Sequence, residues 1–84
     1  MARLDILVHQ GCLSEQSARA LAQEIQHELP GWQIDVRPAE KRDTASLGIL
    51  VFPTFVLEER VLVTGIPQKE WLLARLKEWA RENT

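Results

Sequence analysis

Cysteine is nearly absent from this sequence, in which Cys12 is the only one among 84 residues. A single thiol excludes an internal disulfide and a metal site built from four thiolates. Small secreted domains often compensate for a thin core with several disulfides, and this chain cannot form one by itself. The cysteine count therefore favours a reducing compartment, and we predict a cytoplasmic protein.

Long hydrophobic runs and blocks of positive charge are also missing. No stretch of about 18 apolar residues occurs, so no segment is predicted to span a membrane. Residues 1–5 resemble a signal peptide poorly, because an acid stands at the fifth position. Ten Lys and Arg are spread among twelve Asp and Glu, for a net charge of −2. The sequence therefore lacks the basic footprint of a nucleic-acid-binding protein.

The composition fits one globular domain over residues 1–84. Hydrophobic residues make up 45% of the chain and charged residues 26%, which is ordinary for a soluble domain. A chain of this length buries only about 60% of its unfolded surface, so its core must be densely packed. Repeats and low-complexity segments are absent from the sequence, and one domain is predicted.

The first half of the chain predicts a strand, a helix and a second strand. Residues 4–8 are a short apolar run typical of a buried strand. The helix follows, with Ser14 as its N-cap and Pro30-Gly31 as its end. Its apolar stripe has spacings of three and four: Ala18, Leu21, Ala22, Ile25 and Leu29. Residues 32–37 alternate like a half-buried strand, which completes a right-handed βαβ unit with parallel strands.

The second half predicts a hairpin and a final helix. Residues 39–47 are polar and long enough for one or two helical turns. A strand is expected after Pro53, over residues 54–57, then a charged turn over 58–60 and a returning strand over 61–64. The complete prediction is an α/β fold of order β-α-β-(α)-β-β-α, in which helices flank a four-stranded mixed sheet.

The final helix and the three tryptophans carry further expectations. Pro67 suits the first position of the helix, where its missing N–H costs little. The apolar stripe of the helix comprises Leu72, Leu76, Trp79 and Ala80, so Trp79 is predicted to join the core. Trp71 lies off this stripe and either contacts a partner or packs over the sheet edge. Trp32 is expected to anchor the second strand.

This order, with Cys12 after the first strand and Pro53 before the third, resembles the thioredoxin superfamily, above all its small glutaredoxin-like members. The resemblance covers nearly the whole chain. Residues 51–56 are similar to the cis-proline strand of the family, and residues 63–65 to the end of its closing hairpin. The resemblance implies a thioredoxin-like fold, a cis Phe52–Pro53 bond and a proline turn that lies against Cys12. It also implies that the backbone of Phe52 pairs with an extended substrate.

The active-site motif departs from the family pattern. The family has Cys-x-x-Cys, whereas this chain has Cys12-Leu13-Ser14-Glu15. Because Glu15 replaces the second cysteine, a dithiol cycle cannot run within one chain. Monothiol glutaredoxins work with glutathione, but the basic residues that hold its carboxylates have no clear counterpart here. The buried aspartate of thioredoxins corresponds to Ile6.

Two interpretations of Cys12 stay open. The free N–H groups and the dipole at the start of a helix stabilise a thiolate, which attacks disulfides. Alternatively, Cys12 is a partly buried apolar residue. Glu15 would disfavour the thiolate, and acts either as a proton acceptor for an incoming thiol or simply as an acid in the first helical turn. Ser14 either donates a hydrogen bond to the Cys12 sulfur or only caps the helix.

His9 is the remaining candidate modulator. A protonated imidazole close to Cys12 would lower the pKa of the thiol, whereas the alternative is a structural residue at a strand end. Cys12 and His9 are too few for a zinc site, and His27 is expected at the far end of the helix. We therefore predict no metal.

Three hypotheses for function follow. The first is a monothiol redox protein, in which Cys12 exchanges with disulfides and an external thiol such as glutathione completes the cycle. Leu13, Ser14, Phe52 and Pro53 would frame its substrate, a protein or small-thiol disulfide. The second is a redox-inactive thioredoxin-fold binding module. The third is a small interaction subunit that docks through the surface around Trp71. No resident cofactor, nucleic-acid partner or membrane partner is predicted.

Overall fold

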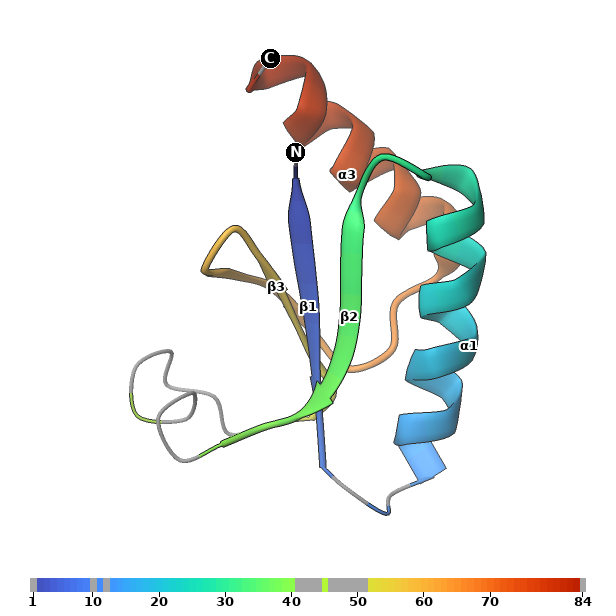
Figure 1. Cartoon of the computed structure of the whole chain (residues 1–84), viewed down its shortest axis with the longest axis vertical. Coiled ribbons are helices and arrows are strands. Elements are labelled where there is room, and N and C mark those ends of the chain that lie inside the picture. Colours follow the sequence, from blue (N-terminus) through green and yellow to red (C-terminus); the bar gives the residue numbers. More distant parts are fainter. Residues whose placement is uncertain (1, 10, 12, 41–44, 46–51, 84) are drawn as a thin grey trace.

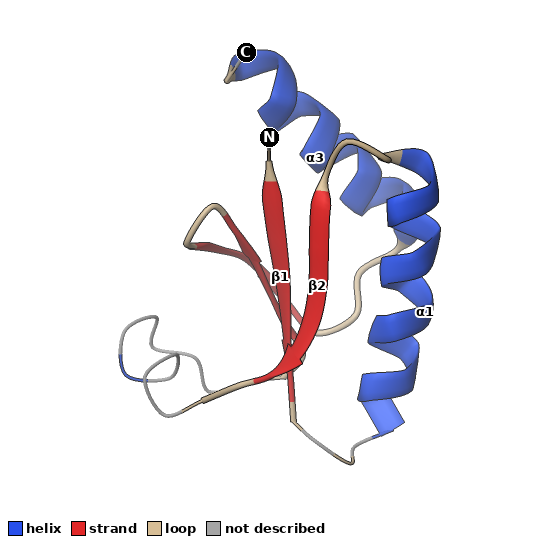
Figure 2. Cartoon of the chain, viewed as in Figure 1, coloured by secondary structure: helices blue, strands red, loops and turns tan. Residues whose placement is uncertain are grey.

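One mixed sheet organises the chain in the computed structural model (Figures 1 and 2). The structure describes residues 2–9, 11, 13–40, 45 and 52–83. The strands are β1 (Arg3–Val8), β2 (Gln33–Pro38), β3 (Thr54–Leu57) and β4 (Arg60–Thr64). Their order is β2-β1-β3-β4; β1 runs parallel to β2, and β3 runs antiparallel to both β1 and β4. The predicted α/β class and four-stranded mixed sheet are confirmed for the described residues.

Two amphipathic helices, α1 (Leu13–Glu28) and α3 (Lys69–Glu82), pack on one face of the sheet (Figure 1). Apolar residues at spacings of three and four place one stripe of each helix against the strands. The core contributed by α1 is Ala18, Leu21, Ala22 and Ile25; that contributed by α3 is Leu72 and Leu76. These positions of the two predicted stripes are buried as expected, whereas Leu29, just past the end of α1, and Trp79 and Ala80 in α3 are only half-buried.

Strand β1 is central and contributes to both faces of the sheet. Leu4, Ile6 and Val8 join the core beneath the helices. Leu7 points to the other face, where it packs with Val56 and the half-buried Phe52. A strand covered on both sides needs a nearly continuous apolar run, which explains the composition of residues 4–8.

Two predicted helix starts are wrong. Helix α1 begins at Leu13, so Ser14 lies inside its first turn and is not the N-cap. Helix α3 begins at Lys69, with the extended Gln68 as its N-cap. The N–H of Leu72 donates to the carbonyl of Gln68 (3.0 Å), which defines that start and leaves Pro67 outside the helix. The helical turns predicted within 39–47 lie largely outside the described residues.

A two-residue turn joins β3 to β4. Glu58 and Glu59 both have positive φ angles, 47° and 69°. This combination is the usual hairpin geometry, because its twist matches that of the paired strands. The Glu58 carboxylate also accepts a hydrogen bond from the N–H of Arg3 (2.8 Å), which ties the turn to the start of β1.

The tryptophans take different positions. Trp32 packs edge-on against Trp79, with ring centroids 5.8 Å apart, and so links the start of β2 to α3. Trp71 is 40% exposed, and the guanidinium of Arg75 lies 5.7 Å from its ring centroid. Trp71 also lines a hollow with Val63, at the β4 edge of the sheet.

No helix in the described part of the chain is long and apolar enough to cross a membrane.

Replacement of Ile25 by alanine tests this core. Ile25 is fully buried, so Ile25→Ala should lower the free energy of unfolding by about 2–5 kcal/mol. Denaturant unfolding measures the change. The matched control is Ile66→Ala, because Ile66 is 46% exposed and surface substitutions usually stay within about 0.5 kcal/mol. Equal losses in the two variants would contradict the assignment of the core.

Candidate functional site

The candidate site lies where β1 ends and the chain turns into α1. His9 and Gly11 follow β1, and Leu13 is the first residue of α1. Cys12, between them, lies outside the described residues. Because Leu7 pairs with Thr54 in the antiparallel ladder of β1 and β3, Pro53 enters the sheet beside the end of β1. Segments that are far apart in the sequence therefore meet here.

His9 and Phe52 are two predicted site residues that the fold brings together. Their ring centroids lie 6.2 Å apart, with the ring planes inclined by 49°. His9 is exposed, whereas Phe52 is half-buried against Leu7 and Val56. One face of the fold therefore gives the Phe52 ring two sets of neighbours, the apolar pair Leu7 and Val56 and the His9 ring.

The Phe52–Pro53 peptide bond is cis, as the resemblance implies. Pro53 is buried, and its carbonyl accepts a hydrogen bond from the N–H of Gly65 (2.7 Å). Proline has no backbone N–H to donate. Pro53 therefore cannot donate a backbone hydrogen bond to a bound peptide.

Glu15 holds the loop before α1 through both of its carboxylate oxygens. Oε1 accepts a hydrogen bond from the N–H of Gly11 (3.2 Å), and Oε2 accepts one from Nε of Arg19 (3.2 Å). A second guanidinium nitrogen of Arg19 lies 3.2 Å from Oε2, as expected for an i,i+4 ion pair. We call this set of contacts the Glu15 clasp.

The clasp favours the ionised form of Glu15. The hydrogen bond from Gly11 and then the contacts with Arg19 lower the pKa of the carboxyl below its ordinary value of 4.5. A carboxylate with a lowered pKa is a weak base. The geometry therefore favours the interpretation of Glu15 as a structural acid in the first helical turn over that of a proton acceptor. Arg19 also offsets its negative charge.

The remaining predicted residues are placed as follows. Ser14 is half-buried in the first turn of α1, one position after Leu13. His27 lies in the last turn of the same helix, far from the candidate site. Among the described residues, no three His, Cys, Asp or Glu side chains gather as metal ligands would.

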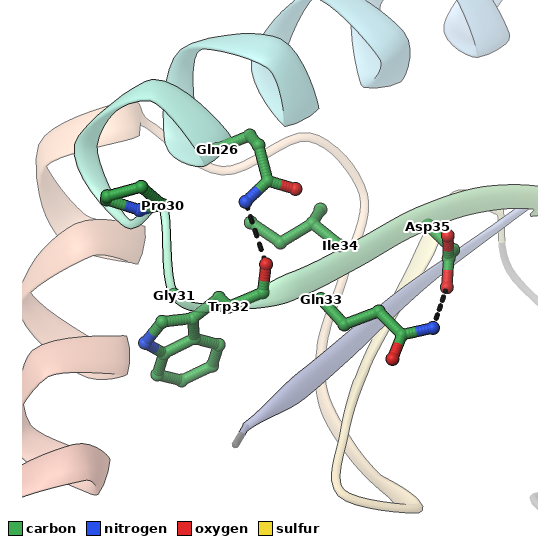
Figure 3. A pocket seen from close by; sticks show the side chains of 7 residues that line it. All are labelled: Gln26, Pro30, Gly31, Trp32, Gln33, Ile34 and Asp35. Carbon is green, nitrogen blue, oxygen red and sulfur yellow. Dashed lines mark hydrogen bonds between the residues drawn. The ribbon is translucent and has the colours of Figure 1, made fainter.

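Sequence reasoning missed two features of this region. It missed Arg19 and the Gly11 N–H as partners of Glu15, although the i,i+4 spacing of Glu15 and Arg19 is a recognisable signal. It also missed two hollows between α1 and β2, of about 550 and 280 Å³, which share Gln26 and Ile34. Figure 3 shows the first, at the start of β2 and so at the opposite end of the sheet from the candidate site.

The Glu15→Gln variant should be less stable than the wild type at neutral pH, because its amide cannot form the ion pair with Arg19. A carboxyl whose pKa is lowered by folding stabilises the native state above its unfolded pKa, and this contribution disappears as the pH falls through the folded pKa. The difference in urea midpoint between the two proteins should therefore shrink as the pH falls below 4.5.

The control for this series is Glu24→Gln, at an exposed position of the same helix. If Glu24→Gln lowered the urea midpoint as much as Glu15→Gln does, with the same pH dependence, the special role of the clasp would be contradicted. Such a result would show that any lost helix charge has the same effect.

Comparison with known proteins gives no match, either to a protein-family model or to a curated protein. The features of this chain that bear on its function are its own sheet order, the end of β1 and the Phe52–Pro53 turn.

Proposed function

We propose that this chain is a thioredoxin-like domain that performs monothiol–disulfide exchange through Cys12. The observation that carries the proposal is the sheet order β2-β1-β3-β4, with Cys12 directly before α1 and the Phe52–Pro53 turn directly before β3. Along the chain, Cys12 follows the first strand and Pro53 precedes the third, which is the order on which the family resemblance rests. The contact between His9 and Phe52 supports it further, because it joins the two segments that would form the active site.

The start of α1 supports a reactive thiol at position 12. The first N–H groups of a helix lack partners within the helix, and together with the dipole they stabilise an adjacent thiolate. Glu15 lies in the same turn but is paired with Arg19. Its charge therefore opposes the thiolate less than that of an unpaired carboxylate would.

The exchange begins when the Cys12 thiolate attacks one sulfur of a substrate disulfide. A mixed disulfide forms, and the other substrate sulfur leaves as a thiolate. A glutathione thiolate then attacks the Cys12 sulfur and displaces the second substrate thiolate. A second glutathione attacks the glutathione sulfur, which releases the Cys12 thiolate and one oxidised glutathione. In total, one substrate disulfide is reduced and two glutathiones are oxidised. Such a cycle suits a reducing compartment such as the cytoplasm.

The pH dependence of Cys12 alkylation tests this function. The thiol should titrate at a pKa of about 7 or below, against about 8.5 for a free cysteine. After exposure to oxidised glutathione, intact mass spectrometry should show one glutathione adduct per chain. The Cys12→Ser variant should show neither reaction. A thiol that titrates at about 9 or above, or that does not react in the folded chain, would overturn the proposal.

A second candidate function is a redox-inactive binding module on the same fold. The Glu15 clasp favours it, because the position of the resolving cysteine is occupied by an acid that holds the loop. The alkylation experiment separates the two functions. An inert Cys12 in a folded chain would support the binding module, and a reactive one would exclude it.

The Glu15→Cys variant tests the proposed geometry independently of the natural activity. If the start of α1 is arranged as in the family, the introduced thiol should form a disulfide with Cys12 under mild oxidation. Both thiols would then resist alkylation until a reductant is added.

The matched control for that experiment is Gln23→Cys, at an exposed position two turns further along α1. At a rise of about 1.5 Å per residue, its thiol lies too far from the helix start to reach Cys12. Intramolecular pairing in the control, or none in Glu15→Cys, would contradict the family geometry.

A further inference from the structure

Strand β2 is at one edge of the described sheet and directs part of its backbone outward. It pairs with β1 in a parallel ladder, in which the N–H of Gln33 donates to the carbonyl of Ala2 and that of Ala39 to the carbonyl of Val8, both at 3.0 Å. In such a ladder, each residue directs its N–H and its C=O to the same side of the strand, and successive residues alternate between the two sides. Gln33, Asp35, Arg37 and Ala39 therefore face β1, and Ile34, Val36 and Pro38 face away from it.

The hollows between α1 and β2 lie along this outer edge. One has a volume of about 550 Å³ and is lined by the start of β2, and the other, of about 280 Å³, is lined by Ile34 and Val36 together with α1. Ile34 and Val36 are only half-buried against the core. The edge thus combines outward backbone groups with an incompletely covered apolar layer on the helical face.

We propose that this chain forms a symmetric homodimer through antiparallel pairing of β2 with β2 of a second copy, with the two-fold axis at Val36. The two sheets would join into one continuous sheet, and both α1 helices would lie on the same face of it. The occupant of the edge is a second copy because the charges of β2 complement themselves in this arrangement.

The charge pattern selects the register. With Val36 opposite its own copy, Asp35 lies opposite Arg37 of the second copy, and the reverse pair forms across the axis. Directly opposed residues that do not exchange backbone hydrogen bonds are the closest in an antiparallel ladder, so these side chains can meet. Arg37 already interacts within its own chain, and its five N–H donors leave capacity for a second carboxylate.

Other registers are less favourable. An axis at Asp35 or at Arg37 sets two like charges directly opposite each other. An axis at Ile34 brings the N–H of Val36 to the carbonyl of Trp32. That carbonyl already accepts a hydrogen bond from Nε2 of Gln26 (2.8 Å; Figure 3).

The register at Val36 also uses the outward backbone groups. Val36 exchanges two hydrogen bonds with its copy, and each Ile34 N–H donates to the carbonyl of Pro38 in the other chain. Pro38 has no N–H, so the pairing ends there. On the helical face, each Pro38 ring lies opposite Ile34 of the other chain and covers the apolar layer beside the hollows.

Charges and proline on an edge strand commonly prevent pairing. In the proposed dimer, the same residues instead restrict pairing to one register. The protein should have the mass of one chain if these residues prevent pairing, and the mass of two chains if they direct it. Sedimentation equilibrium of the full chain at low salt should give twice the chain mass. The mass should return towards that of one chain as salt is raised, because the exposed ion pairs are screened. A monomer at millimolar concentration and low salt would overturn the proposal.

Charge inversion tests the register. Asp35→Arg sets positive charges opposite each other, and Arg37→Asp sets negative charges opposite each other, so each variant alone should be monomeric. An equimolar mixture of the two should form a heterodimer, because every opposed pair is then complementary. This recovery also shows that both variants are folded.

The matched control is Arg60→Asp, at an exposed position on the β4 edge of the sheet. It should leave the dimer intact. Hydrogen exchange gives a local measurement, in which the amides of Ile34 and Val36 should exchange more slowly at high than at low protein concentration. A dimer that survives both single inversions, or that the Arg60→Asp change abolishes, would overturn the proposal.

Discussion

The antiparallel pairing of β1 with β3 is the constraint on which the rest of the structure depends. It places Thr54 opposite Leu7, and so brings the Phe52–Pro53 turn to the end of β1. The same central strand carries β2 on its other side. Because β1 is covered on both faces, a shift of one residue in its register would turn Leu4, Ile6 and Val8 away from the helices. The hydrophobic core therefore fixes the alignment of the candidate site.

The Glu15 clasp ties the loop after β1 to the first turns of α1. In the proposed family, a thiol at the position of Glu15 serves the chemistry. Here a carboxylate in that position accepts a hydrogen bond from the N–H of Gly11 and pairs with Arg19, so it supports the turn into α1. If the thiolate of Cys12 is the reactive group, its resolution must come from outside the chain, and the proposed use of an external thiol follows from this replacement.

Among the described residues, Arg19 belongs both to the candidate site and to one of the hollows along the β2 edge. Arg19 pairs with Glu15 at the start of α1 and also lines the hollow beside Val36. Pairing through the β2 edge would leave the turn at Phe52 on the other side of β1, next to β3. A dimer of the proposed kind is therefore compatible with access to the candidate site, and both copies would present that site independently.

Local patterns in the sequence were sufficient to predict the elements. The apolar run of residues 4–8 and the helical stripes through Ile25 and Leu76 identify buried strands and helix faces, because side-chain periodicity reports local geometry directly. The exact helix starts were not predictable in this way. Ser14 and Pro67 both suit a helix start chemically, yet in the folded chain α1 begins at Leu13 and α3 at Lys69, with Gln68 as its N-cap.

The sequence by itself determined that this is an α/β domain with one thiol and an acid three positions after it. Only the tertiary structure decided which distant groups meet, such as His9 with Phe52 and Trp32 with Trp79. It also decided that the outer edge of β2 lies beside a hollow lined by α1. The physical reason is that pairing between strands depends on long-range register and packing, which no local pattern of residues encodes.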